Sequence, residues 1–268
     1  MAASVAASTG RLATRVATGA VLIAVTLAAV WAGGLAFTAL VALAVLLMFA
    51  EWCVMHRVPR GLRQAGLVIL AVVVALASYG PVAQALLVAV GGALLLGLFA
   101  RSYIGGRAAW LGAGILYCAL PAIALIVLRG GRAGFELTVW TLAIVWATDI
   151  FAYFAGRAIG GAKLAPAISP NKTWAGLAGG MAGAALVSVL IAQAFGGSLP
   201  VFRWALVAGA ALALAAQGGD LFESWMKRRA GVKDSGTLLP GHGGVLDRLD
   251  GLVPVAVLSA ALFAWVLP

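Results

Sequence analysis

The sequence predicts an all-α polytopic membrane protein with about nine transmembrane helices, its N-terminus in the cytoplasm and its C-terminus outside. Hydrophobic residues make up 64% of the 268-residue chain, and charged residues only 10%. A soluble domain of this length would carry roughly a quarter charged residues. Apolar stretches of about 20 residues, long enough to cross a bilayer, also recur along the whole chain.

The apolar spans follow one another with short polar connections. The first one continues through Trp31, which is longer than the 7–15 apolar residues of a signal peptide, so we expect a retained helix. We expect one membrane domain over 1–268, with N-terminal helices in 1–130 and a catalytic region in 137–268. The nine expected spans cover residues 14–32, 35–53, 65–80, 82–100, 108–128, 137–156, 174–195, 202–219 and 251–267.

The distribution of Lys and Arg predicts the orientation. Of the eighteen basic residues, fifteen fall on one side of the nine spans, and only Arg129, Arg132 and Arg203 fall on the other. Cytoplasmic loops carry the excess of positive charge, so the richer side faces the cytoplasm. The net charge of +10 is then explained by topology and anionic lipids, and no nucleic-acid partner is expected. The two long cytoplasmic loops are residues 157–173 and 220–250.

The second of these loops concentrates the charge of the protein. It holds five of the eight acidic and five of the eighteen basic residues. If the eighth helix continues, Asp220, Glu223 and Lys227 share one face with Ser224, because they lie three or four residues apart. Asp247 and Asp250 are also three residues apart, before the last span. Carboxylates at two adjacent helix ends suit Mg²⁺, which uses one or two of them plus phosphates and waters. Ordinary ion pairs at a helix interface are the alternative.

Between these acids lies a segment that suits phosphate binding. Lys233 is followed by His242, Gly243 and Gly244, and glycines permit close backbone approach and amide nests for anions. His242 serves as a proton carrier or, more in keeping with a glycine-rich loop, as a structural or substrate-positioning group. The cations at 227–229 could also serve only headgroup binding or topology.

The order of polar residues over 224–250 resembles the signature of the phosphatidate cytidylyltransferases, also called CDP-diacylglycerol synthases. The matching positions are Ser224, Met226, Lys227, Arg228, Lys233, Asp234, Gly236, Leu239, Pro240, His242, Gly243, Gly244, Val245, Asp247, Arg248, Leu249 and Asp250. So many polar and glycine positions at fixed spacing make the resemblance specific. It extends from about Asp149 to Asp250, whereas the first 130 residues match only as apolar spans.

The preceding loop agrees with this resemblance. Asp149 lies inside the sixth span, where a carboxylate costs roughly 2.5–3.5 kcal/mol on insertion scales, so we expect it to face a polar interior. Residues 169–173 (Ser-Pro-Asn-Lys-Thr) resemble a Ser-Pro-Lys-Lys-Thr segment usual in the family, with Asn171 in place of the usual Lys. Two residues further on, Ala175 stands where the family usually has Glu. Ser169 and Thr173 also read as helix caps, which is compatible with phosphate binding.

The resemblance implies transfer of the cytidylyl group of CTP to phosphatidate, which gives CDP-diacylglycerol and pyrophosphate. It implies Mg²⁺, allows K⁺ beside it, and suggests a homodimer among membrane lipids. We expect Asp220 and Asp247 to hold Mg²⁺, with Asp250, Glu223 or Asp149 nearby. Residues expected to bind or align the substrates are Ser169, Lys172, Thr173, Ser224, Lys227, Arg228, Lys233, His242, Gly243, Gly244 and Arg248.

Two other functions remain open on the sequence. The spacing of Asp247 and Asp250 faintly resembles that of CDP-alcohol phosphotransferases, although their longer aspartate array is not found. An ion-coupled transporter would explain Asp149, but transport sites lie near the membrane midplane, and here the polar residues gather on one face.

Overall fold

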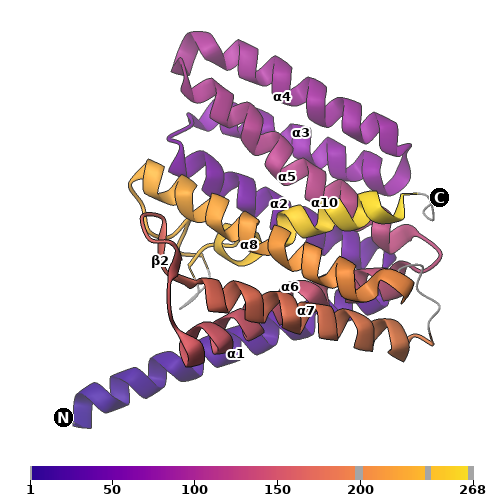
Figure 1. Ribbon diagram of the computed structural model, residues 1–268. Coiled ribbons are helices and arrows are strands. Elements are labelled where there is room, and N and C mark those ends of the chain that lie inside the picture. The colour runs from indigo at the N-terminus through magenta and orange to yellow at the C-terminus, as the bar shows by residue number, and fades with distance from the viewer. Residues whose placement is uncertain (1, 197–201, 239–242, 265–268) are drawn as a thin grey trace.

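The computed structural model describes residues 2–196, 202–238 and 243–264, with side chains from residue 17 onward (Figure 1). The described residues form a bundle of helices with one small β-hairpin. The long helices are α1 (Ala2–Ala32), α2 (Gly34–Met55), α3 (Arg60–Tyr79), α4 (Val82–Ile104), α5 (Arg107–Gly130), α6 (Gly134–Ile159), α7 (Trp174–Ala194) and α8 (Ala205–Ala230). The shorter elements are β1 (Lys163–Ala165), β2 (Ser169–Thr173), η1 (Phe202–Trp204), α9 (Leu246–Leu249) and α10 (Leu252–Phe263).

The architecture is that of an all-α polytopic membrane protein. Within the described ranges, seven helical segments are long and apolar enough to cross a membrane, from Gly34–Met55 to Phe202–Ala230. The first and last of the nine expected spans correspond only to shorter apolar helices, Ala17–Ala32 and Leu252–Phe263. The predicted class is therefore confirmed, whereas the count of nine is not.

Small residues allow the closest helix packing, between α6 and α7. A Cβ atom added at Gly183 would overlap the Phe151 ring, and one at Gly179 would overlap Ala155. Close backbone approach through glycine provides van der Waals contact where lipid supplies no hydrophobic driving force between helices. In Figure 1, α6 and α7 run side by side at the bottom of the view, with α8 beside α7. Helices α3, α4 and α5 form a layer at the opposite edge of the bundle, at the top of the view.

The loop after α6 differs from the expected helix cap. Residues 163–173 form an antiparallel hairpin that pairs Lys163 with Thr173 and Ala165 with Ser169. Only Thr173 caps α7, where its Oγ1 accepts a hydrogen bond from the N–H of Gly176 at 3.0 Å. Ser169 lies within β2 instead of at a helix start, because the chain is extended up to Thr173.

The two ends of the charged loop follow different courses. Helix α8 continues to Ala230, as the spacing of its charged residues predicts, and ends at Gly231 in the left-handed region (φ +74°). Beyond the loop, Asp247 lies in the four-residue α9, and Asp250 ends that helix before α10 begins at Leu252. The two aspartates therefore do not extend the last apolar helix, and they have different partners.

Candidate functional site

Hairpin β1–β2 brings a cation to the polar half of α8. Lys172 Nζ lies 2.6 Å from Asp220 Oδ2 and donates a hydrogen bond to Gln217 Oε1 at 2.9 Å. Ser224, one turn further along α8, donates to Asp220 Oδ1 at 3.3 Å. The Lys172 and Asp220 side chains are 16% and 33% exposed. This ion pair is thus partly buried but open enough to meet a ligand.

A second cluster joins α8 to α9. Lys227 Nζ lies 2.6 Å from Glu223 Oε2 and 2.7 Å from Asp247 Oδ1. Glu223 is fully buried, and the Lys227 and Asp247 side chains are 13% and 5% exposed. One buried ammonium group therefore balances two carboxylates that are 24 positions apart in the sequence.

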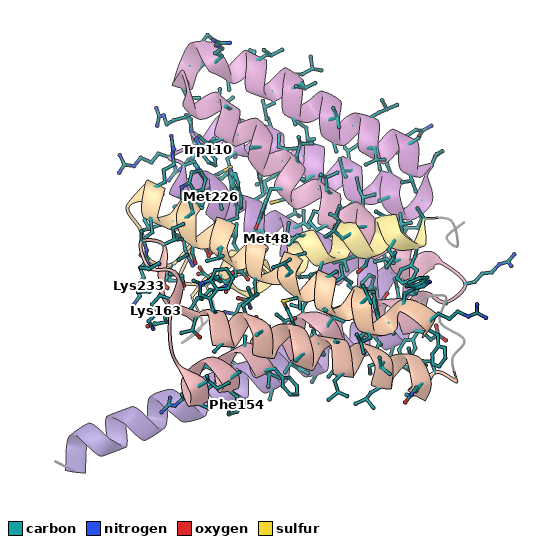
Figure 2. The ribbon with its side chains drawn as sticks, in the orientation of Figure 1. Met48, Trp110, Phe154, Lys163, Met226 and Lys233 are labelled. Carbon is teal, nitrogen blue, oxygen red and sulfur yellow. The ribbon has the colours of Figure 1, made fainter. Side chains whose placement is uncertain are left out.

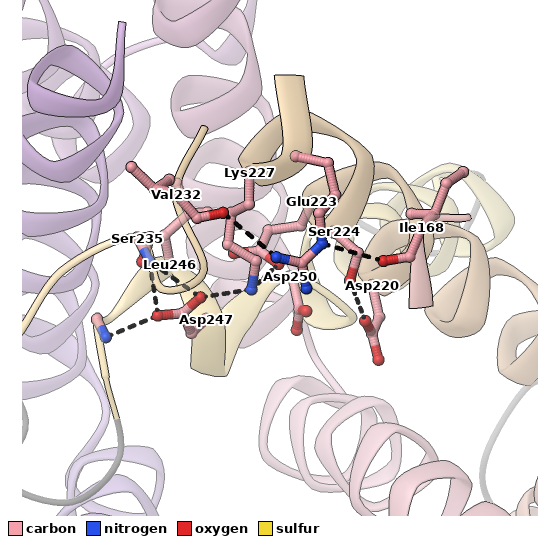
Figure 3. Close-up of polar contacts among 12 residues, drawn as sticks. Ile168, Asp220, Glu223, Ser224, Lys227, Val232, Ser235, Leu246, Asp247 and Asp250 are labelled. Atoms are coloured by element: carbon pink, nitrogen blue, oxygen red, sulfur yellow. Dashed lines mark hydrogen bonds and ion pairs between the residues drawn. The ribbon is translucent and has the colours of Figure 1, made fainter. Parts of the chain in front are cut away.

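Asp247 also holds the backbone of the preceding loop (Figure 3). Its Oδ2 accepts the N–H groups of Ser235 at 3.0 Å and Gly244 at 2.8 Å. Burial opposes the charge, but the hydrogen bonds that Asp247 accepts from Lys227 and the Gly244 N–H, together with the charge of Lys227, lower the pKa of Asp247 to about 2. The Asp247 carboxylate is therefore ionised and saturated by protein donors. Neighbouring Gly243 has φ +82°, and a Cβ there would lie 2.8 Å from Asp247 Oδ2.

A third carboxylate reaches the same loop from the N-terminal half. Glu51, on α2, is 9% exposed. It accepts hydrogen bonds from the Val245 and Leu246 N–H groups, both at 2.9 Å, and from Ser235 Oγ at 3.2 Å. The sequence interpretation missed this residue. A lone carboxylate within an apolar span was the available signal, the same that singled out Asp149.

Asp149, Asp220 and Asp250 form a group of acids that act on one another electrostatically. Asp149 is exposed on the protein surface and interacts electrostatically with Asp220, Lys172 and Arg248. Burial, followed by the charge of Asp220, raises the pKa of Asp250, and the bond that its Oδ1 accepts from the Gly251 N–H offsets only part of this. Three carboxylates thus share two nearby cations, Lys172 and Arg248.

Among the described residues, the carboxylates do not form a complete metal site from protein groups alone. No cluster of three or more His, Cys, Asp or Glu side chains with metal-binding geometry occurs among the described residues. Asp220 belongs to the Lys172 cluster and Asp247 to the Lys227 cluster, so the two expected ligands have separate partners. A cation bound near Asp220 would need further oxygens from substrate or water.

The remaining expected site residues lie around these clusters. The Arg228 guanidinium donates to the carbonyls of Ile168, in the hairpin turn, and Val232, at 3.4 and 3.5 Å (Figure 3). Lys233 is exposed, at the same end of the molecule as Lys163 (Figure 2). His242 lies outside the described residues.

These features define the class of protein: a polytopic membrane protein whose charged groups meet where a hairpin, the end of one long helix and a short helix come together. A profile of the cytidylyltransferase family matches residues 13–266. The chain is 44% identical over 266 residues to a phosphatidate cytidylyltransferase of Brucella abortus, covering 94% of each chain. Relatives with the same name from Rickettsia felis and Pseudomonas aeruginosa are 35% and 41% identical over 69% and 60% of this chain, and 82% and 59% of their own. The chain belongs to the cytidylyltransferase family.

Proposed function

We propose that this protein transfers the cytidylyl group of CTP to phosphatidate and forms CDP-diacylglycerol and pyrophosphate in phospholipid biosynthesis. Family membership supports nucleotidyl transfer, and the curated relatives named phosphatidate cytidylyltransferase support the lipid substrate. The observation that carries the proposal is the pairing of Lys172 with Asp220 and of Lys227 with Asp247. The first pair ties residues 169–173 to α8, where Ser224 of the 224–250 signature donates to Asp220, and the second pair joins the two ends of that signature.

The reaction is a displacement at phosphorus. An oxygen of the phosphatidate phosphate attacks the α-phosphorus of CTP and forms a new P–O bond. The bond from the α-phosphorus to the oxygen bridging to the β-phosphorus breaks, and pyrophosphate leaves with the electron pair. The attacking phosphate is already ionised near neutral pH, so the step needs no strong general base. Charge neutralisation and alignment of two polyanions are the main requirements.

The cations around α8 are suited to both requirements. Lys172 approaches from the hairpin, and Lys227 approaches from within α8 itself. Exposed Lys233 and Arg248 add charge at the same end of the molecule. Substrate phosphates would compete with the carboxylates for Lys172, whereas Lys227 stays engaged and keeps the loop in place.

The donor set near Asp220 also fits Mg²⁺. The carboxylates of Asp220, Asp250 and Asp149 are hard oxygen ligands, three negative groups that act on one another, and two substrates supply further oxygens. Mg²⁺ held there would neutralise the triphosphate and the leaving group. Asp247, whose oxygens already accept bonds from Lys227 and two backbone N–H groups, fits a supporting role better than direct ligation. K⁺ beside Mg²⁺ remains part of the proposal.

The test is formation of CDP-diacylglycerol by the purified full-length protein from labelled CTP, phosphatidate and Mg²⁺. We expect turnover that EDTA stops and excess Mg²⁺ restores. Turnover that persists in EDTA would refute the metal assignment. Transport of a solute without CTP turnover would favour the transporter, and consumption of CDP-diacylglycerol with an alcohol would favour a CDP-alcohol phosphotransferase.

We also propose nine membrane spans, with the N-terminus and the site in the cytoplasm and the C-terminus outside the inner membrane of a bacterial-type cell. The 15:3 division of basic residues supports this orientation. Thiol labelling of single cysteines introduced at Lys233 and Arg203, from each side of sealed vesicles, tests it. A homodimer, which the family resemblance suggests, is tested by light scattering of the purified protein.

A further inference from the structure

The Glu51 carboxylate lies at the junction between α2 and the start of α9. Three donors converge on it: Val245 N–H on Oε1, and Leu246 N–H with Ser235 Oγ on Oε2. Ser235 precedes Val245 by ten positions, so the carboxylate holds both ends of one loop. Both of its oxygens are used.

Two glycines of the loop leave the space that the Glu51 carboxylate occupies. A Cβ at Gly236 would lie 2.6 Å from Glu51 Oε1, and one at Gly244 would lie 2.5 Å from Oε2. Real Cβ atoms do not approach oxygen this closely, so the carboxylate would have to move. The glycine requirement therefore arises at Gly236 from Glu51, a side chain of the other half of the protein, and at Gly244 from Glu51 together with the Ser235 hydroxyl, which would lie closer still to the added Cβ.

Asp247 binds the same two loop ends from the other side, through the N–H groups of Ser235 and Gly244. Glu51 and Asp247 thus hold Ser235 and the start of α9 between them. Asp247 also pairs with Lys227, a cation of the candidate site. Displacing Glu51 would move the backbone N–H groups of Ser235 and Gly244, which donate hydrogen bonds to Asp247. It would therefore also disturb the pair between Asp247 and Lys227.

We propose that Glu51 is a positioning residue for nucleotidyl transfer. It fixes the loop ends, and through them α9 with Asp247, Arg248 and Asp250, relative to α8. This inference rests on the proposed function. It gives α2, which lies outside the two sequence motifs of the site, a part in the site.

Glu51→Gln is the informative variant. Glutamine has the same size but replaces one acceptor oxygen with an NH₂ group. That NH₂ group would face the N–H and hydroxyl donors that now bind the carboxylate. A buried donor without an acceptor is costly, so the loop ends should separate from α2. Glu136→Gln, a change of the same type near the start of α6, is the matched control. Glu51→Asp keeps both acceptor oxygens but is one methylene shorter.

The measurements are the KM for CTP and the rate of tryptic cleavage after Lys233, both on the full chain in detergent. We expect Glu51→Gln to raise the KM at least about tenfold, equivalent to about 1.4 kcal/mol, and to accelerate cleavage. Glu51→Asp should give intermediate values, and Glu136→Gln those of the wild type. Loss of folded protein alone would lower the apparent kcat and leave the KM unchanged. An unchanged KM in Glu51→Gln therefore overturns the proposal, whatever the cleavage rate.

A second variant covers the case in which Glu51→Gln does not fold. Gly236→Ala keeps the carboxylate but displaces it, and should raise the KM and the cleavage rate in the same direction. Gly61→Ala is its control, because a Cβ there meets nothing within 4 Å. Wild-type values in Gly236→Ala would overturn the proposal. If the wild-type protein shows no CTP turnover, the proposed function fails, and the cleavage rates alone still decide whether Glu51 holds the loop.

Discussion

Lys227 lies between two buried carboxylates and pairs with both, so its removal should destabilise the fold strongly. In Lys227→Met, the fully buried Glu223 loses an ion-pair partner at 2.6 Å. Asp247 loses a partner at 2.7 Å but keeps the N–H groups of Ser235 and Gly244. Removing one member of a buried ion pair costs about 3–5 kcal/mol, because an uncompensated charge stays behind. We expect a loss in that range, most of it arising at Glu223.

The assay is unfolding in detergent by titration with sodium dodecyl sulfate, followed by tryptophan fluorescence. Lys163→Met, a change of the same type at an exposed position in β1, should alter the free energy of unfolding by less than about 0.5 kcal/mol. Adding Glu223→Gln to Lys227→Met removes the stranded charge and should recover about 1–3 kcal/mol, the size of coupling seen between contacting residues. The reasoning is refuted if Lys227→Met unfolds like Lys163→Met, or if the second substitution lowers stability further.

Other predictions concern the remaining polar contacts and the helix packing. Lys172→Met removes the cation beside Asp220, and we expect kcat/KM for CTP to fall about 100-fold; an assay within threefold of wild type would contradict this. Asp247→Asn points an NH₂ group at backbone donors and should cost about 1–3 kcal/mol in the same unfolding titration, whereas Asp220→Asn, at the more exposed site, should cost less than half as much. Gly183→Ala forces a Cβ against an aromatic ring of α6 and should cost about 1–3 kcal/mol; Gly218→Ala, which meets open space, is its control, and equal stabilities would exclude close packing there.

Local spacing was sufficient to predict part of this arrangement. The separation of Asp220, Glu223 and Lys227 predicts a continued helix, and α8 does extend to Ala230. The salt bridge between Glu223 and Lys227 is likewise a contact four residues apart within one helix. The length and apolar character of the spans predict the class of fold, because a bilayer imposes both on every crossing helix.

Contacts between distant segments could not be predicted in the same way. The sequence groups Asp220 with Glu223 and Asp247 with Asp250, whereas the structure pairs Asp220 with Lys172 and both Glu223 and Asp247 with Lys227. Which cation reaches which carboxylate depends on how the hairpin and α9 pack against α8, and no local periodicity contains that information.

The hairpin shows how two local signals can compete. The Ser-Pro and Thr residues of 169–173 are good helix-start residues, but extended pairing between β1 and β2 persists up to Thr173. A helix cap therefore forms only at the last of the expected positions. Glu51 could have been noticed as a carboxylate in an apolar span, although its partners, 184 to 195 positions away, could not.

The contact between Glu51 and the loop also has a consequence for the order of synthesis. Ser235 follows Glu51 by 184 residues, and at about 5–20 residues per second the ribosome needs on the order of 10–40 s to make that stretch. During this time α2 has been made but its carboxylate has none of the three donors that bind it in the finished protein. A carboxylate is expensive to keep in hydrocarbon, so this end of α2 stays at the water boundary until the last part of the chain emerges. Chains cut short before Ser235 never acquire these donors.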